Sequence, residues 1–277
     1  MQAAPYPKHL LSEMTFEEFG ARLVDAPVML LPFGSQEEQG PHAPMGDFML
    51  TERISALAAE RSGAIAAPTL PFGHADFFRS FAGGIQLRTS TFKAVVEDIA
   101  TAFLDHGLNR LVVINGHTTN AFLIDEVMRK LREERGVMMA SINIWQCLRD
   151  EDWTAIHGEN KGKVRGHGAD PVTSAYWHLF PSLMRPDLYR PAGDRKAFGL
   201  PTMGPMGVLF DGAVVNMPIT AREANATGMM GGGDANQSSA GAGAQIIERI
   251  VSHIDGFVRH FSVCDPRSLA APGATHG

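Results

Sequence analysis

The chain has 277 residues, 44% of them hydrophobic, with 24 basic and 30 acidic residues and a net charge of −6. The intermixed charges argue against a nucleic-acid-binding surface, which needs clustered lysine and arginine, and no stretch reaches the roughly 18 consecutive apolar residues of a membrane-spanning helix. Cys147 and Cys264 are the only cysteines and residues 1–14 lack the apolar core of an export signal, so we expect a cytoplasmic protein without a disulfide framework.

The order of the predicted elements indicates an α/β fold. In chain order we expect a strand at 28–34, a helix at 48–61, strands at 64–70 and 85–87, a helix capped by Ser90 or Thr91 and ending at Leu104, a strand at 111–114, a helix at 120–135, a strand at 137–145, and helices at 171–179 and 240–261. The main strands show little polar alternation, which is typical of strands buried on both faces. We therefore predict one three-layer domain over residues 1–277, with a mostly parallel sheet flanked by helices.

Three segments show little periodicity. Residues 1–25 form an N-terminal lead-in. Residues 149–168 are polar and are predicted to be irregular. Residues 191–233 are rich in glycine, proline and methionine, and such a long irregular excursion is typical of an active-site lid or of a contact between subunits. The sequence leaves the choice between these two roles open.

Two polar segments each follow a predicted strand. The first is GSQEEQGPHAPMGD at residues 34–47, and the second is NGHTTN at residues 115–120. Because α/β proteins build their sites at the carboxyl ends of parallel strands, we expect the two segments to meet. Glu37, Asp47 and His117 are then candidate metal ligands, since two carboxylates and an imidazole hold Zn²⁺, Mn²⁺ or Fe²⁺ while leaving a position open for water.

Each of these three residues also has an ordinary structural explanation. Glu37 fits a solvated loop acid, and Asp47 fits the N-cap of the helix that begins at Phe48. His117 fits a hydrogen-bonded turn residue. Taken one at a time, the residues leave both interpretations open.

The same motifs carry a family resemblance. The residues that carry it are Leu31 to Ser35, Glu37, Gly40 to His42, Pro44, Asp47, Phe81 to Ile85, Asn115 to His117, Asn120, Gly166 to Ala169, Thr173 with Ser174, and Gly233 with Asp234. In their order and their placement after strands they resemble the creatininase (creatinine amidohydrolase) family, over about residues 28–250. The resemblance implies a single α/β domain, assembly as a homo-oligomer and usually a homohexamer, and a divalent-metal site that opens cyclic amides or cleaves related C–N bonds.

The resemblance also implies roles for individual residues. Glu37, Asp47 and His117 fall on family ligand positions, with Asp47 expected to bridge two metals. His167 falls on a catalytic histidine position, which would move protons between water, the tetrahedral intermediate and the departing nitrogen. The structural alternative for His167 is a loop histidine bonded to backbone. Asp170 is a candidate catalytic residue as the orienter of His167, or else it caps the helix that follows.

Two residues depart from the family pattern at the metal site. Gln39 stands where the family commonly has a histidine ligand to the second metal, and Thr119 stands where creatininase itself has a glutamate ligand. A neutral amide is a far weaker ligand than imidazole, so we expect the second metal to be weakly held or lost. The prediction is one firmly bound divalent cation per chain, Zn²⁺, Mn²⁺ or Fe²⁺.

Three further departures concern the substrate pocket. Val172 replaces a family glutamate, Arg165 stands where relatives often have aspartate, and Phe78 stands where many have histidine. These changes remove negative charge and add an apolar surface and a cation, which suits an anionic or aromatic substrate better than neutral creatinine. Arg165 can bind a carboxylate in bidentate fashion, although an exposed loop arginine is the ordinary case. Trp145, at the end of a strand, is placed to contact a planar ring.

The sequence leaves three possible functions open. The leading hypothesis is a metal-dependent amidohydrolase that cleaves a cyclic amide, or another amide such as a formamide, with metal-activated water and His167 as proton shuttle. The second is a metal-dependent lactone hydrolase. The third is a family member that has lost catalysis and binds a small molecule or serves as a structural subunit. We expect a small-molecule substrate, neither nucleic acid nor membrane as a partner, and a homo-oligomer such as a hexamer.

Overall fold

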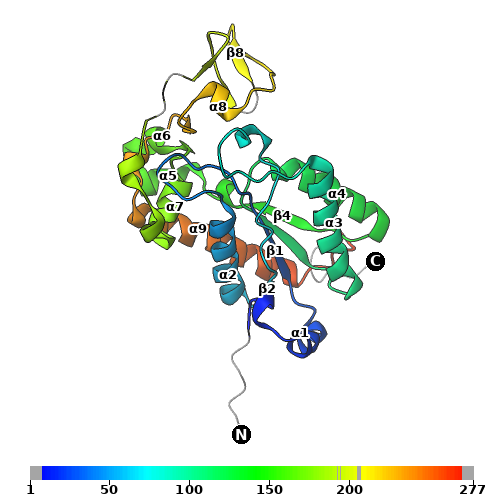
Figure 1. The fold of residues 1–277 in the computed structure, drawn as a ribbon. Helices are drawn as coiled ribbons and strands as arrows, with labels where there is room; N and C mark the ends of the chain where they lie inside the picture. Colours follow the sequence, from blue (N-terminus) through cyan, green and yellow to red (C-terminus); the bar gives the residue numbers. More distant parts are fainter. Residues whose placement is uncertain (1–7, 192, 194, 205–206, 270–277) are drawn as a thin grey trace.

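The centre of the fold is a parallel four-stranded sheet (Figure 1). A computed structural model describes residues 8–269 except 192, 194, 205 and 206, so residues 1–7 of the lead-in lie outside the described part. The strands are β1 (Met29–Phe33), β2 (Ile65–Ala66), β3 (Leu111–Asn115) and β4 (Ala140–Asn143), in the spatial order β2-β1-β3-β4. Every residue of β1 and β3 is buried, as their apolar sequence predicts.

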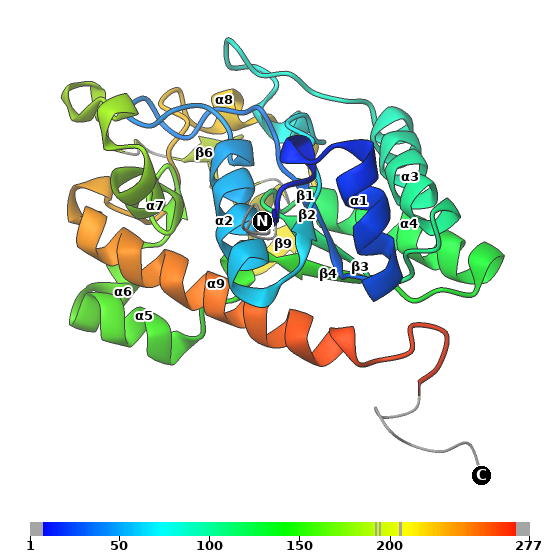
Figure 2. The ribbon, with the colours of Figure 1, turned by 90° about the horizontal axis from the view of Figure 1, so that it is seen from below.

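Helices cover both faces of the sheet, which confirms the predicted three-layer α/β fold (Figure 2). One face packs against α3 (Thr89–Asp105) and α4 (Asn120–Arg135), together with side chains from α1 (Phe16–Arg22). The other face packs against α2 (Phe48–Ser62), α7 (Val172–Leu179) and α9 (Ala240–Ser262). Alternate residues of β1 enter the two cores, Leu31 on the first face and Leu30 on the second.

Residues 149–168, predicted to be irregular, instead form two short helices. These are α5 (Asp150–His157) and α6 (Lys161–Val164). Trp153 and Val164 are buried in the same core as α9, while most residues around them are exposed and polar. A helix of one or two turns places too few apolar residues on one face to show periodicity, so its stability comes from tertiary packing that the local sequence does not reveal.

Several predicted boundaries are also corrected. β2 and β4 are shorter than the predicted strands at 64–70 and 137–145, because pairing ends early and β4 turns into a 3-10 helix at Ile144–Gln146. The predicted strand at 85–87 is reduced to a single bridge between Ile85 and Gln36. Arg88 is the N-cap of α3 and makes no side-chain cap, so Ser90 and Thr91 lie within the helix rather than before it.

The described residues of the segment 191–233 form short paired strands and a short helix. The described strands are β6 (Lys196–Ala197), β7 (Leu200–Pro201), β8 (Val208–Phe210), β9 (Ala213–Val215) and β10 (Met230–Gly231), and the helix is α8 (Ala221–Ala224). The β8–β9 hairpin stands away from the sheet in Figure 1. At the far end of the segment, β10 returns and pairs with β5 (Gly166–His167). None of the helices among the described residues combines the length and the apolar character needed to cross a membrane.

Candidate functional site

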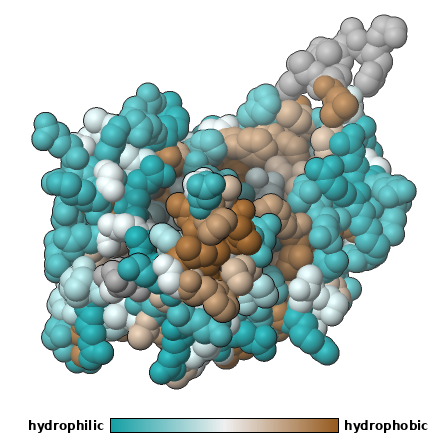
Figure 3. Space-filling view, turned by 90° about the horizontal axis from the view of Figure 1, so that it is seen from above, coloured by the Kyte–Doolittle hydropathy of each residue, from teal (hydrophilic) through white to brown (hydrophobic). Residues whose placement is uncertain are grey.

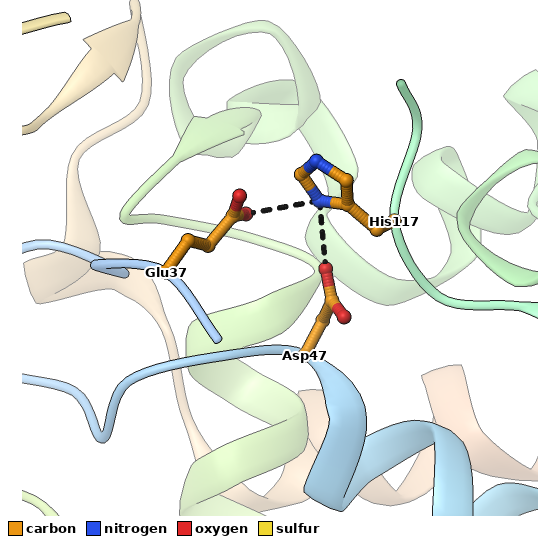
Figure 4. Close-up of side chains that lie close together, drawn as sticks. All are labelled: Glu37, Asp47 and His117. Carbon is orange, nitrogen blue, oxygen red and sulfur yellow. Dashed lines mark hydrogen bonds and ion pairs between the residues drawn. The ribbon is translucent and has the colours of Figure 1, made fainter. Parts of the chain in front are cut away.

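Three candidate ligands meet at the carboxyl edge of the sheet (Figure 4). β1 and β3 end in register, with Phe33 opposite Asn115, so the loops that follow them start side by side. Glu37 lies on the loop after β1, Asp47 stands at the start of α2, and His117 follows β3. The Nδ1 atom of His117 is 3.2 Å from Oε1 of Glu37 and 3.0 Å from Oδ2 of Asp47, and all three side chains are buried.

The carboxylate of Asp47 is directed into this cluster. Its Oδ1 accepts a hydrogen bond of 2.7 Å from the backbone N–H of Ser35, and its Oδ2 accepts one of 3.1 Å from the hydroxyl of Ser35. Asp47 occupies the N-cap position of α2, but its side chain makes no capping bond to that helix. The cap explanation considered for Asp47 is therefore wrong.

The hydrogen bonds of Thr119 fix the tautomer of His117. The Thr119 hydroxyl donates its only hydrogen to the backbone carbonyl of His74, so it must accept from Nε2–H of His117, at 2.7 Å. When the imidazole is neutral, Nδ1 then carries the free lone pair, and Nδ1 faces the two carboxylates. Metal-binding histidines are oriented by such outer hydrogen bonds.

The charges of the cluster call for a cation. Burial alone lowers the pKa of His117, but the charges of Glu37 and Asp47 and their hydrogen bonds outweigh it and raise that pKa to about 10. Burial raises the pKa of Glu37. Two buried acceptors, Oε2 of Glu37 and Oε1 of Gln39, have no hydrogen-bond partner among the described residues. Buried acceptors without donors are costly, and a divalent cation offsets two carboxylates beside a neutral imidazole, so these residues fit a metal.

His167 is held by Glu38, a residue that the sequence analysis did not identify. Nε2 of His167 lies 2.8 Å from the backbone carbonyl oxygen of Glu38 and 2.9 Å from its Oε1, so Nε2–H donates to Glu38. The imidazole stacks on Phe78 with ring centroids 4.1 Å apart. Burial lowers the pKa of His167, but the charge of Glu38 and its hydrogen bonds outweigh it and raise that pKa. Only the adjacency of Glu38 to Glu37 in the sequence pointed toward it.

Of the two roles considered for Asp170, the orientation of His167 is not supported, because none of the described contacts of Asp170 involves His167. Oδ1 of Asp170 accepts from the backbone N–H of Ser174 and from the hydroxyl of Ser238, and Oδ2 accepts from the hydroxyl of Ser174. Oδ2 also lies 3.0 Å from Nε2 of His157. The bond to the N–H of Ser174 in α7 agrees with the alternative helix-capping role, and the neighbouring imidazole is that of His157 rather than His167.

One cavity of about 480 Å³ brings all the candidate residues together. Its lining includes Glu37, Asp47, Phe78, His117, Trp145, Arg165, His167 and Asp170. Trp145 donates a hydrogen bond of 2.6 Å from Nε1 to the carbonyl of Gly116, which fixes its ring beside the metal ligands. The guanidinium of Arg165 lies 4.7 Å from the ring centroid of Trp153, which also lines the cavity. Gln39, Thr119 and Val172 line it as well, so each departure from the family pattern faces the site.

Comparison with known proteins gives one family. Residues 12–258 match the family model for creatininase, described as creatinine amidohydrolase. The creatinine amidohydrolase of Pseudomonas putida is 31% identical over 50% of this chain and 59% of its own length. The 3-dehydro-scyllo-inosose hydrolase of Thermotoga maritima is 23% identical over 62% of this chain and 56% of its own length. The mycofactocin precursor peptide peptidase of Mycobacterium ulcerans is 26% identical over 67% and 75%. The chain thus matches somewhat more than half the length of the first two relatives.

Solved creatininase structures share the fold. A glutamate-to-glutamine mutant of creatininase in a Zn-Zn form has a TM-score of 0.76 and 26% identity, over 92% of this chain and 98% of that chain. A creatininase structure described as the Mn form has a TM-score of 0.75 and 25% identity, over 91% of this chain and 98% of that chain. Zinc and manganese therefore occur in proteins with this fold.

Proposed function

The chain belongs to the creatininase family, and from this premise we propose that it is a metal-dependent amidohydrolase that cleaves a cyclic amide or a related C–N bond. The relatives that it matches are hydrolases, which supports an enzyme. The observation that carries the proposal is the buried cluster of Glu37, Asp47 and His117, whose ligand atoms lie within 4.8 Å of one another.

Glu37, Asp47 and His117 would hold the cation. When bound, a divalent cation supplies Lewis-acid chemistry, since it polarises an amide carbonyl and lowers the pKa of water. Asp47 is kept in place by Ser35, and Thr119 keeps Nδ1 of His117 turned toward the carboxylates. The side chains of Glu37, Asp47 and His117 are buried, which strengthens the electrostatic interactions among them.

His167 would act as the proton shuttle. Hydrolysis forms a bond between the water oxygen and the carbonyl carbon, breaks the C–N bond, and moves a proton from water to the departing nitrogen. Glu38 holds Nε2–H of His167, so Nδ1 is the nitrogen left to exchange that proton. The charge of Glu38 stabilises the imidazolium form, which a general acid needs when it protonates a poor leaving group.

The anchoring of His167 favours amide over lactone hydrolysis. An amide nitrogen must be protonated before it leaves, whereas a lactone oxygen depends less on an acid. His167 is held by two hydrogen bonds to Glu38 and is stacked on Phe78, which suits the proton donor that amide cleavage requires. Loss of His167 is therefore expected to affect amide cleavage more strongly.

We expect one firmly held cation per chain, Zn²⁺, Mn²⁺ or Fe²⁺. Gln39 donates from Nε2 to Oε1 of Glu37 at 3.0 Å, and Thr119 is engaged by His117 and His74, so neither offers the anionic or imidazole donor of a second site. The double substitution Gln39→His with Thr119→Glu restores the two ligand types that the family resemblance places there. It should raise the metal content from one toward two per chain.

The chain is also expected to work in the cytoplasm as a homo-oligomer, with a hexamer as the state that the family resemblance favours. Apolar surface gathers on the face that carries the projecting hairpin (Figure 3). Within the segment 191–233, Phe198, Phe210 of β8, and Val214 and Val215 of β9 are exposed. Exposed apolar clusters of this kind are typical of protein contacts, and light scattering of the purified protein would give the subunit number.

Metal analysis tests the hydrolase proposal. Elemental mass spectrometry of protein purified without chelator should give about one cation per chain, and a panel of cyclic amides, formamides and lactones should contain at least one amide that is hydrolysed only by the metal-loaded protein. Absence of metal after incubation with zinc, manganese or iron salts would instead support a non-catalytic binding protein. Turnover of lactones alone would support the second hypothesis.

A further inference from the structure

The wall of the cavity formed by α5 and the segment after it presents hydrogen-bond donors without acceptors. Arg165 lies between α6 and β5 and lines the cavity, and its guanidinium stacks over the ring of Trp153. Neither a carboxylate nor a carbonyl among the described residues pairs with this guanidinium. Trp153 is only 2% exposed, and its buried Nε1–H also has no acceptor among the described residues. Both side chains line the cavity, but the Nε1–H of Trp153 is buried from it, so the guanidinium of the exposed Arg165 is the donor that a ligand can reach.

Asp170, whose backbone pairs with that of Arg165, already has other hydrogen-bond partners. The backbones of Arg165 and Asp170 form a bridge, but the carboxylate of Asp170 accepts from Ser174 and Ser238 and lies beside His157. Val172, which also lines the cavity, adds no charge. The cation of Arg165 is thus left for a group that enters the cavity from outside.

The remaining walls suit a flat ring. Phe77, Phe78, Trp145 and Trp153 all line the cavity, and its volume of about 480 Å³ matches a small cyclic molecule. Aromatic faces offer a large contact area for a planar ligand at a low entropic cost. A guanidinium matches the two oxygens of a carboxylate in a fork geometry.

We propose that the substrate is a flat, cyclic amide that carries a carboxylate, with the carboxylate bound by Arg165, which stacks on Trp153, and the amide placed at Glu37, Asp47 and His117. This proposal rests on the proposed amidohydrolase function and specifies its substrate class. Hydrolysis would add the water oxygen to the amide carbon and leave the ring nitrogen as a protonated amine, so the product would carry a second carboxylate.

Matched ligand pairs test the carboxylate preference without requiring turnover. Orotate and uracil share one planar ring and differ by the carboxylate, and benzoate and benzamide form a second pair. Calorimetric titration of the purified, metal-bearing protein should give at least about tenfold tighter binding for the carboxylate in at least one pair, as expected for charge-assisted hydrogen bonds. Equal binding of both members in both pairs, or no measurable binding of either carboxylate at millimolar concentration, would overturn the proposal.

Variants identify the group responsible. Arg165→Gln should abolish the preference and Arg165→Lys should keep part of it, because a lysine retains the charge without the fork. Lys163→Gln is the matched control, since it removes an exposed cation two residues away that does not line the cavity. Arg165 is exposed, so its variants should keep the melting temperature of the parent. A preference that survives Arg165→Gln would contradict the assignment.

The outcomes for substrate class and for hydrolysis can be separated. If the protein binds no metal and cleaves no amide, but orotate still binds through Arg165, the carboxylate site stands and the hydrolase proposal fails. If the protein binds metal and cleaves neutral amides but shows no carboxylate preference, the hydrolase proposal stands and the substrate class fails. Repeating the titration with His117→Ala, which should lack metal, shows whether the carboxylate instead binds the cation.

Discussion

The two ends of the cavity differ in which polar groups lack a partner. At the sheet edge, the buried side chains of Glu37 and Gln39 have acceptors without donors, whereas on the opposite wall the exposed guanidinium of Arg165 has donors without an acceptor among the described residues. Unpaired buried groups are rare in folded proteins. Acceptors without donors fit a cation, and donors without acceptors fit an anion. A substrate bound between the two ends would therefore have its reacting group at one and its charge at the other.

The two ends also differ in how they are built. The sheet-edge end is fixed by hydrogen bonds from adjacent backbone, such as Ser35 to Asp47, and by the register of β1 and β3. The opposite wall depends on two short helices and on β5, which pairs with β10 of the segment 191–233. The proposed chemistry would thus depend on the sheet, while the proposed recognition would depend on segments that contact each other over long sequence distances.

The largest effect is expected at the acceptor end, from loss of the histidine ligand. His117→Ala should reduce the metal content from about one per chain to near zero and reduce amide hydrolysis at least about 10³-fold, because the remaining carboxylates no longer complete the site. His178→Ala is the control, since His178 is an exposed histidine of α7. Elemental mass spectrometry and turnover measured on the same samples check both effects, and an active, metal-loaded His117→Ala variant would refute the mechanism.

Removal of the proton shuttle should separate chemistry from metal binding. His167→Ala is expected to keep the metal but lose about 10²- to 10⁴-fold in kcat on an amide, the range typical of a general acid or base. A lactone of similar shape should lose much less. The same loss on amide and lactone would indicate that His167 supports the structure rather than proton transfer.

The outer hydrogen bond of His117 should affect affinity for the metal. Thr119→Val removes the hydroxyl that accepts from Nε2–H of His117, and we expect metal affinity to fall about 10- to 100-fold. Thr118→Val is the neighbouring control. Thr118 is exposed, and none of the described hydrogen bonds joins its side chain to His117. Competition with a chelator of known affinity gives both values, and equal affinities would mean that Thr119 does not orient the ligand.

Glu38 is expected to act through His167. Glu38→Gln keeps an oxygen acceptor but removes the charge that raises the pKa of His167, so the pKa should fall and the protonated form should be lost at lower pH. The alkaline limb of the kcat profile should move to lower pH, with kcat reduced about tenfold at its optimum and KM little changed. A purely structural role would lower stability without moving that limb.

The smallest expected effect comes from a pair of glycines with almost the same backbone. Gly228 and Gly199 have φ angles of 77° and 76°, but a Cβ on Gly228 would lie 2.1 Å from Oε2 of Glu38, whereas a Cβ on Gly199 meets nothing within 4 Å. Both alanine variants should lose about 1 kcal/mol of stability from the left-handed backbone. Only Gly228→Ala should also reduce kcat, because it displaces Glu38. Equal kcat values would show that Glu38 need not stay in place.

The sequence alone determined the acceptor end of the cavity. The apolar runs of β1 and β3 predict buried parallel strands, and candidate ligand residues placed just after such strands come together at one edge. These are local signals, since a strand and the loop that follows it are adjacent in the chain. For that reason Glu37, Asp47 and His117, and the fold that holds them, could be predicted.

Only the tertiary structure decided the partners at the other positions. Glu38 and His167 are 129 residues apart, and nothing in the local pattern of either residue indicates the other. The helix at Asp150–His157 and the change of partner for Asp170, from His167 to His157, likewise follow from packing against α9 and α7. Contacts between side chains that are far apart in the sequence depend on how the helices pack against the sheet. That packing is determined by the whole core rather than by any one segment.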